Sequence, residues 1–226
     1  MTKVVVFDLY GTVMTSEKGL ESKDEALSLI LREAGHEVYY QEVWSTRQFV
    51  AFLDYPRGRA NTARKYYARV LERLEISPDA KLIDKLVNKD AEIEKNLLYQ
   101  DVPPTVSWLK ANGIRTAIVT TIASWRFVPL LKQNNVEIDS ICTAREAGAV
   151  KPNPKIYSAV LDKFGVNAGE AAMVVDDPKT DIIPAKKIGM KTVLLCREEK
   201  RECAEADWII SSLTQLLDLI KESKFS

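Results

Sequence analysis

The sequence contains little histidine and little cysteine. Its single histidine is His36, so we do not expect a histidine base or a metal centre built from several histidines. The three cysteines, Cys142, Cys196 and Cys203, are odd in number and form no CxxC pair. This pattern favours free thiols in a reducing compartment over a disulfide framework, and it gives no support to a redox function.

The sequence also lacks an excess of either charge and a long apolar run. Lys plus Arg and Asp plus Glu each number 32, so the formal net charge is zero and indicates neither a nucleic-acid nor a membrane partner. No apolar stretch reaches the roughly 18 residues of a membrane-spanning helix. The early run VVVF is too short for a signal peptide. We therefore expect a cytoplasmic protein, monomeric or homodimeric, that acts on a small molecule.

Alternating strand and helix patterns predict an α/β fold with a doubly wound parallel sheet. The composition, 46% hydrophobic and 28% charged, is typical of a globular protein. The expected strands cover residues 3–7, 114–119, 140–143, 171–175, 191–195 and 208–210, and the expected helices cover 106–112, 126–134, 155–164, 179–188 and 213–221.

Residues 22–100 show helical patterns only and are expected to form an all-helical insert. Ser22 and Glu25 match a capping box at the start of its first helix. The second helix is expected at 41–53 and the third at 60–74. Ser77 and Pro78 resemble an N-cap with Pro in the first turn, which predicts a fourth helix through residue 97.

Polar residues follow several of the expected strands. Because ligands of open parallel sheets bind at the carboxyl ends of the strands, these residues are predicted to meet at one edge. They are Asp8, Tyr10, Gly11 and Thr12 after the first strand, Thr120 and Thr121 after the second, Lys151 in a later loop, and Asp176, Asp177 and Asp181 after the fourth. Carboxylates, hydroxyls and one ammonium suit an anionic substrate held with a divalent cation.

Each of these signals has a simpler explanation when it is taken alone. An aspartate after an apolar strand is often a turn residue, and Lys151 by itself is a solvated loop lysine. Asp176 and Asp177 alone are compatible with a helix N-terminus, where the helix dipole favours negative charge. The simpler explanations do not account for the order in which these residues follow successive strands.

Four segments resemble the signatures of the haloacid dehalogenase-like superfamily, in that family's order. They are FDLYGTV around Asp8, AIVTT ending at Thr121, AVKPNPKIY around Lys151, and VVDDPKTDIIPAKKIGM, which contains Asp176. The resemblance covers nearly the whole chain, because the helical segment lies where the family has its type 1 cap. It implies a Rossmann-like core at residues 1–14 and 101–226 and a helical cap at residues 15–100.

The resemblance implies covalent catalysis by an aspartate. Asp8 would attack the substrate and form an aspartyl intermediate that water then hydrolyses. Lys151 would neutralise Asp8 and the charge of the reacting group, and Thr120 would donate a hydrogen bond to that group. The implied catalytic residues are Asp8, Tyr10, Thr12, Thr120 and Lys151, and the implied substrate contacts are Gly11, Thr121 and Arg47.

The phosphatase branch of the family further implies a Mg²⁺ site. Its ligands would be the second carboxylate oxygen of Asp8, the main-chain carbonyl of Tyr10 and an acid of the fourth signature. Asp177 is favoured for that acid because of its spacing to Asp181. Asp176 and Asp181 are expected to bind the ion through water or to support its ligands.

Tyr10 departs from the phosphatase pattern, which has a second aspartate there as general acid. Tyrosine at this position resembles the 2-haloacid dehalogenases, whose halide leaves without a proton and which need no metal. That branch also takes halide on a cap arginine, for which Arg47 is the candidate and Arg57 and Arg59 are alternatives. A solvated or structural charge is the simpler explanation of all three arginines.

Three functions therefore remain open. The first is a Mg²⁺-dependent phosphohydrolase acting on a small phosphorylated metabolite, favoured by the acidic fourth signature. The second is a metal-independent 2-haloacid dehalogenase, favoured by Tyr10. The third is a non-catalytic binding or receiver-like module. In a receiver the acidic pair comes early in the chain, whereas Asp176 and Asp177 come late.

Overall fold

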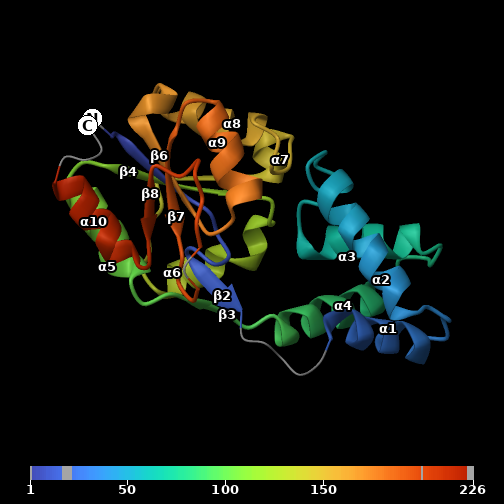
Figure 1. The fold of residues 1–226 in the computed structure, drawn as a ribbon. Helices are drawn as coiled ribbons and strands as arrows, with labels where there is room; N and C mark the ends of the chain where they lie inside the picture. The colour runs from blue at the N-terminus through green and yellow to red at the C-terminus, as the bar shows by residue number, and fades with distance from the viewer. Residues whose placement is uncertain (1, 17–21, 200, 223–226) are drawn as a thin grey trace. The chain divides into compact units, whose positions relative to one another are not determined.

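The computed structural model describes residues 2–16, 22–199 and 201–222. The chain divides into two compact units (Figure 1). The larger unit contains Met1–Thr15 and Leu97–Ser226, and the smaller unit contains Ser16–Asn96. The smaller unit is therefore inserted into the sequence of the larger one, between its first strand and the rest of its sheet.

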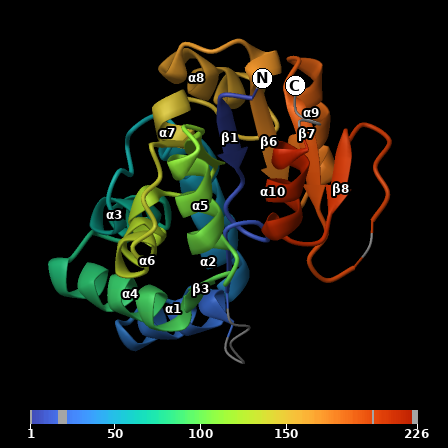
Figure 2. The ribbon, with the colours of Figure 1, turned by 90° about the vertical axis from the view of Figure 1, so that its left-hand side faces the viewer.

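A six-stranded sheet with the order β5-β4-β1-β6-β7-β8 forms the centre of the larger unit. All neighbouring pairs in this sheet run parallel, and β1, β6, β7 and β8 follow one another across Figure 2. Its strands are β1 Val4–Phe7, β4 Arg115–Thr120, β5 Ser140–Thr143, β6 Ala171–Val175, β7 Lys191–Leu195 and β8 Trp208–Ile210. The chain adds β4 and β5 on one side of β1 and then β6, β7 and β8 on the other. The strand order thus switches between β1 and β6, where ligands of such sheets bind.

Helices cover both faces of this sheet, which confirms the expected doubly wound α/β fold (Figure 1). One core packs the sheet against α5 Val102–Ala111, α6 Val128–Gln133 and α10 Leu213–Lys221. The other packs it against α7 Ala144–Ala147, α8 Lys155–Phe164 and α9 Ile183–Lys187. The side chains of β1 alternate between the two cores, since Val5 and Phe7 belong to the first and Val4 and Val6 to the second. Burial on both faces explains why this strand is apolar throughout.

Several helices of the larger unit differ from the expectation at their ends. α5 begins at Val102, because Pro103 and Pro104 occupy a first turn in which a missing N–H is tolerated. The segment expected as one helix at 126–134 is divided into η2 Ser124–Arg126 and α6. The segment expected at 179–188 opens with the π-helical turn η4 Pro178–Ile182, and η3 Ala168–Glu170 precedes β6. α7 and the small sheet of β2 Met14–Ser16 and β3 Asn96–Leu98 were not expected.

The smaller unit is helical apart from its ends, which lie in the small sheet. Its elements are α1 Lys23–Glu33, α2 Tyr40–Phe49, the π-helical turn η1 Val50–Asp54, α3 Ala63–Arg73 and α4 Ala80–Ile93. Their inward faces bury apolar and tyrosine side chains, among them Leu27, Leu31, Val43, Tyr66, Tyr67, Leu71 and Leu86. Trp44, Phe49 and Phe52 are exposed, whereas Tyr66 and Tyr67 belong to this core.

Two expected helix caps in the smaller unit differ in the structure. Ser22 is the N-cap residue of α1, as expected, but its side chain makes no capping hydrogen bond, so the predicted capping box is wrong. α4 begins after Asp79 rather than after Ser77, because the Asp79 carboxylate accepts a hydrogen bond of 2.8 Å from the Leu82 N–H. Within the described residues, no helix has both the length and the apolar character needed to cross a membrane.

The cap of α4 gives a stability prediction. Asp79→Ala should lower the free energy of unfolding of the smaller unit by about 0.5–2 kcal/mol, because the Leu82 N–H loses its acceptor. Ser77→Ala is the matched control and should leave it unchanged. Thermal unfolding followed by far-UV circular dichroism measures both. Equal loss in the two variants would contradict this assignment of the cap.

Candidate active site

The expected site residues of the larger unit lie at the carboxyl edge of its sheet. Asp8 follows β1, Thr120 ends β4 and Asp176 follows β6. Lys151 comes from the loop between α7 and α8. Because β1 pairs with both β4 and β6 in parallel, the ends of these three strands are neighbours, and Asp8 and Asp176 flank the point where the strand order switches.

One buried ammonium lies between two buried carboxylates. The Nζ atom of Lys151 forms an ion pair with Oδ1 of Asp8 and lies 2.6 Å from Oδ1 of Asp181. The three side chains are 7%, 14% and 3% exposed, respectively, so water screens these contacts only weakly. The structure thus brings together residues that are 143 positions apart in the sequence.

Burial sets the protonation preferences of this group. It raises the pKa of Asp8, which Lys151 lowers and Asp176 raises further. It likewise raises the pKa of Asp181, with Lys151 again acting in the opposite direction. Burial alone would lower the pKa of Lys151, but Asp8 and Asp181 outweigh it and the pKa is raised. A single cation therefore compensates the two carboxylates only in part.

Tyr157 and Thr180 hold Asp181 in place. The fully buried Tyr157 hydroxyl lies 2.5 Å from the main-chain oxygen of Thr180 and 3.1 Å from Oδ1 of Asp181. The Thr180 hydroxyl donates to Oδ2 of Asp181 at 2.9 Å. Burial, together with Asp181, raises the pKa of Tyr157 well above its usual range, so this group stays a hydrogen-bond donor. The sequence offered no signal for Thr180.

Asp176 and Asp177 have different surroundings. Oδ2 of Asp176 lies 2.1 Å from the place where a Cβ on Gly11 would be, and Gly11 has φ +72°. A side chain at position 11 would therefore collide with Asp176, and only glycine fits this left-handed turn. Oδ1 of Asp177 instead accepts hydrogen bonds from the N–H groups of Lys179 and Thr180, at 2.7 and 3.0 Å. Asp176 thus faces the loop that follows Asp8, whereas Asp177 caps η4.

The predicted site residues that carry hydroxyl groups lie at or after the ends of the neighbouring strands β1 and β4. Thr120 is buried, and its Oγ1 accepts a hydrogen bond of 3.1 Å from the Ile122 N–H, which leaves its own proton available for donation. The Thr12 hydroxyl is buried without a hydrogen-bond partner among the described residues. Thr121 and Tyr10 are half-buried, and Tyr10 packs against the core that contains α5 and α10.

Arg197 holds the loop after Asp8 and was not found from the sequence. Its guanidinium donates to both carboxylate oxygens of Asp101, at 3.0 and 2.9 Å, and to the main-chain oxygen of Thr12 at 2.7 Å. Its carbon Cζ lies 3.7 Å from the centre of the Tyr99 ring. Arg197 therefore ties the loop of Asp8 to the segment where the chain returns from the smaller unit. No motif marks it, because Arg197 is 185 residues from Thr12.

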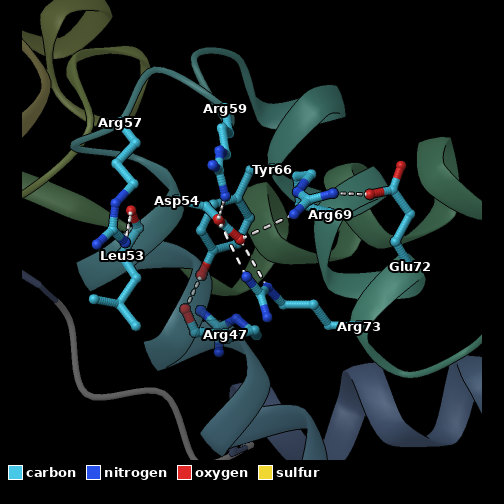
Figure 3. Close-up of polar contacts among 9 residues, drawn as sticks. All are labelled: Arg47, Leu53, Asp54, Arg57, Arg59, Tyr66, Arg69, Glu72 and Arg73. Carbon is cyan, nitrogen blue, oxygen red and sulfur yellow. Dashed lines mark hydrogen bonds and ion pairs between the residues drawn. The ribbon is translucent and has the colours of Figure 1, made fainter.

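Arg47 belongs to the smaller unit, and its partners Asp24 and Tyr66 belong to the same unit. Its guanidinium is nearly buried and forms an ion pair with Asp24. The main-chain oxygen of Arg47 accepts a hydrogen bond from the Tyr66 hydroxyl (Figure 3). Burial opposes its charge, but Tyr67, Tyr66 and the neighbouring carboxylates outweigh burial and raise its pKa. These contacts support a structural role for Arg47, and its expected substrate contact stays a prediction.

The chain matches the family of haloacid dehalogenase-like hydrolases over residues 2–189. Because this match spans most of the chain, the protein belongs to that family and is a hydrolase.

Its relatives include both branches of the family. The chain is 25% identical to a glyceraldehyde 3-phosphate phosphatase of Methanocaldococcus jannaschii, with 99% of each chain covered. It is also 25% identical to the (S)-2-haloacid dehalogenase 4A of Burkholderia cepacia, over 98% of this chain and 96% of that one. Among solved structures, a phosphatase from Thermococcus onnurineus has a TM-score of 0.65 at 25% identity, over 97% of this chain and 98% of that one. A 2-haloacid dehalogenase from Pseudomonas syringae pv. Tomato has a TM-score of 0.74 over 99% and 100% of the chains; at 22% identity it shows the fold alone.

The contacts of Arg197 give a prediction for hydrolytic turnover. Arg197→Gln should lower the free energy of unfolding by about 1–3 kcal/mol, because Asp101 and the Thr12 carbonyl lose a charged donor. It should also lower kcat by about tenfold or more, because the loop after Asp8 is no longer held in position. Asp101→Asn keeps the bond between Arg197 and the Thr12 carbonyl. It should therefore lower the free energy of unfolding but reduce kcat less than Arg197→Gln does. Lys186→Gln, at a more exposed ion pair with Asp207, is the control. Unchanged kcat in Arg197→Gln would contradict the positioning role.

Proposed function

We propose that this hydrolase is a Mg²⁺-dependent phosphohydrolase of small phosphorylated molecules, with Asp8 as its nucleophile. The observation that carries the proposal is a group of three buried or half-buried carboxylates, Asp8, Asp176 and Asp181. The ammonium of Lys151 pairs with Asp8 and Asp181, and the guanidinium of Arg201 lies near Asp176, so the carboxylates still outnumber the cations. Relatives named as glyceraldehyde 3-phosphate phosphatase, ribulose-1,5-bisphosphate 5-phosphatase and phosphoglycolate phosphatase support the same class of reaction.

The catalytic cycle follows from the surroundings of Asp8. A carboxylate oxygen of Asp8 forms a bond to phosphorus while the bond from phosphorus to the leaving oxygen breaks. Water then attacks the phosphoaspartyl intermediate, releasing phosphate and restoring the carboxylate. Lys151 offsets negative charge at Asp8 and on the phosphoryl group, and Thr120 has a free proton to donate to a phosphoryl oxygen.

The residues fit a magnesium site by their chemistry. Asp8, Asp176 and the main-chain carbonyl of Tyr10 supply hard oxygen donors, and the raised pKa values of Asp8 and Asp176 mark carboxylate charge that a further cation would stabilise. When bound, Mg²⁺ would polarise the phosphoryl oxygens. Among the described residues, no group of three or more His, Cys, Asp and Glu side chains is arranged to hold a metal by itself. A site completed by a main-chain oxygen and by the substrate is in keeping with that arrangement.

Asp176 is the better candidate than Asp177 for the acid that binds the metal. The Asp176 carboxylate lies beside Gly11, in the loop that follows Asp8. The Asp177 carboxylate already accepts two main-chain hydrogen bonds at the start of η4. We assign Asp181 the role of holding Lys151, because it contacts the Lys151 Nζ directly.

Haloacid dehalogenation is the second candidate, and Tyr10 together with the Burkholderia relative favours it. Its chemistry would use the same Asp8 attack, on carbon instead of phosphorus, and would expel halide without a proton donor. Three carboxylates near only two cations, Lys151 and Arg201, are poorly suited to a carboxylate substrate without a metal, because like charges at close range repel one another.

A paired substrate screen tests the function. Aryl, acyl and alkyl phosphates and 2-haloacids should be assayed with Mg²⁺ and with EDTA, for the wild type and for Asp8→Asn. We expect Mg²⁺-dependent phosphate release that Asp8→Asn abolishes. Since Tyr10 replaces the usual acid, alkyl phosphates should react slower than aryl or acyl phosphates by about 10²–10⁴-fold, the usual contribution of a general acid. Turnover of 2-haloacids alone, unaffected by EDTA, would replace this proposal with the dehalogenase.

The choice between the two adjacent aspartates gives a separate prediction. Asp176→Asn should raise the Mg²⁺ concentration needed for half-maximal activity by about tenfold or more, since one charged ligand of the hard cation is lost. Asp177→Asn is the matched variant at the neighbouring position and should change it little. Activity titrated against Mg²⁺ measures both. A larger effect in Asp177→Asn would reverse the assignment.

A further inference from the structure

Three arginines of the smaller unit surround one buried carboxylate (Figure 3). Asp54, at the end of η1, is fully buried. Its oxygens lie 2.7 and 3.2 Å from Nε and Nη2 of Arg73, 3.6 Å from Nη1 of Arg59 and 3.6 Å from Nη2 of Arg69. We call these four residues the Asp54 cluster. All belong to the smaller unit, so the cluster is defined without reference to the larger one.

One of the three arginines is sufficient to satisfy the carboxylate. Arg73 donates to both oxygens of Asp54, and its Cζ lies 3.8 Å from the centre of the Phe49 ring, which fixes the guanidinium from a second side. At 3.6 Å, Arg59 and Arg69 are too far away for hydrogen bonds to Asp54. They are attracted by the charge of Asp54, but their N–H donors are not used by it.

Positive charge is in excess around the cluster. Glu72 pairs with Arg69, but Arg57, whose guanidinium donates to the main-chain oxygen of Leu53 at 3.0 Å, adds another cation from the same segment. The side chains of Arg59 and Arg69 are 59% and 30% exposed. The Nε of Arg69 is buried and has no hydrogen-bond partner among the described residues. The cluster therefore combines solvent access with guanidinium donors left over from its internal bonds.

The backbone is specialised for this arrangement. The turn η1 is π-helical, a rare form that is frequent at functional sites and that here ends with the carboxylate of Asp54 directed inward. Arg69 and Arg73 are four residues apart on α3, which places them on one face of that helix. Burying an ionised carboxylate is costly, and Arg73 lowers the pKa of Asp54, with burial opposing it, so the carboxylate remains a fixed anchor for the arginines.

We propose that the Asp54 cluster is a binding site for an oxyanion, a phosphate or carboxylate group, held by Arg59 and Arg69. Guanidinium groups bind such anions through paired N–H donors, and the charge of Asp54 keeps both arginines near this site. Asp54 and Arg73 form the frame that positions them. The ligand is a free phosphate or carboxylate ion, or a small molecule that carries such a group.

Binding is tested without reference to activity. In the full chain with Asp8→Asn, inorganic phosphate should shift the arginine Nε–Hε NMR signals of Arg59 and Arg69 in a saturable way. Arg59→Gln with Arg69→Gln should weaken binding at this site, followed through the Arg73 signal, by about tenfold or more, because two charged donors are lost. Arg64→Gln is the matched control on the same helix, where Arg64 pairs with Asp84 instead. No saturable shift in the parent chain, or equal affinity in the double variant, would overturn the proposal.

Discussion

The contact on which the rest of the site depends is the ammonium of Lys151 between the carboxylates of Asp8 and Asp181. All three partners are nearly buried, so removing Lys151 would leave two uncompensated carboxylates where water screens them only weakly. The surrounding structure is consistent with that constraint. Tyr157 and Thr180 orient Asp181, and the parallel sheet supplies the fixed edge at which Asp8 and the loop of Lys151 meet.

The balance of buried charge also relates the site to the chemistry proposed for it. The two cations Lys151 and Arg201 leave negative charge in excess beside Asp8, Asp176 and Asp181. This excess is unfavourable in isolation but suits a site completed by a divalent cation and an anionic substrate. The Asp54 cluster shows the opposite local balance, because there the cations outnumber the carboxylate they share. Both imbalances are local to these clusters, because the chain as a whole is neutral.

Much of the fold could be predicted because its signals are local. The strands of the sheet are continuous apolar runs, a pattern that burial on both faces requires, and β5, β6, β7 and β8 have the expected bounds. Helix starts were less predictable. Ser77 and Asp79 are both good capping residues, and only the register of α4 against its neighbours decides which of them has an N–H within reach. The π-helical turns η1 and η4 likewise have no sequence signature.

The sequence alone determined the family, the α/β fold and the residue types at the ends of the strands, since short spacings and apolar periodicity are enough to specify them. The tertiary structure decided which of those residues meet. It separated Asp176, beside Gly11, from Asp177, which caps a helical turn, although the two are chemically identical neighbours. It also supplied Arg197 and the Asp54 cluster. Their partners lie up to 185 residues away, and at such separations only the folded backbone sets the distance between charges.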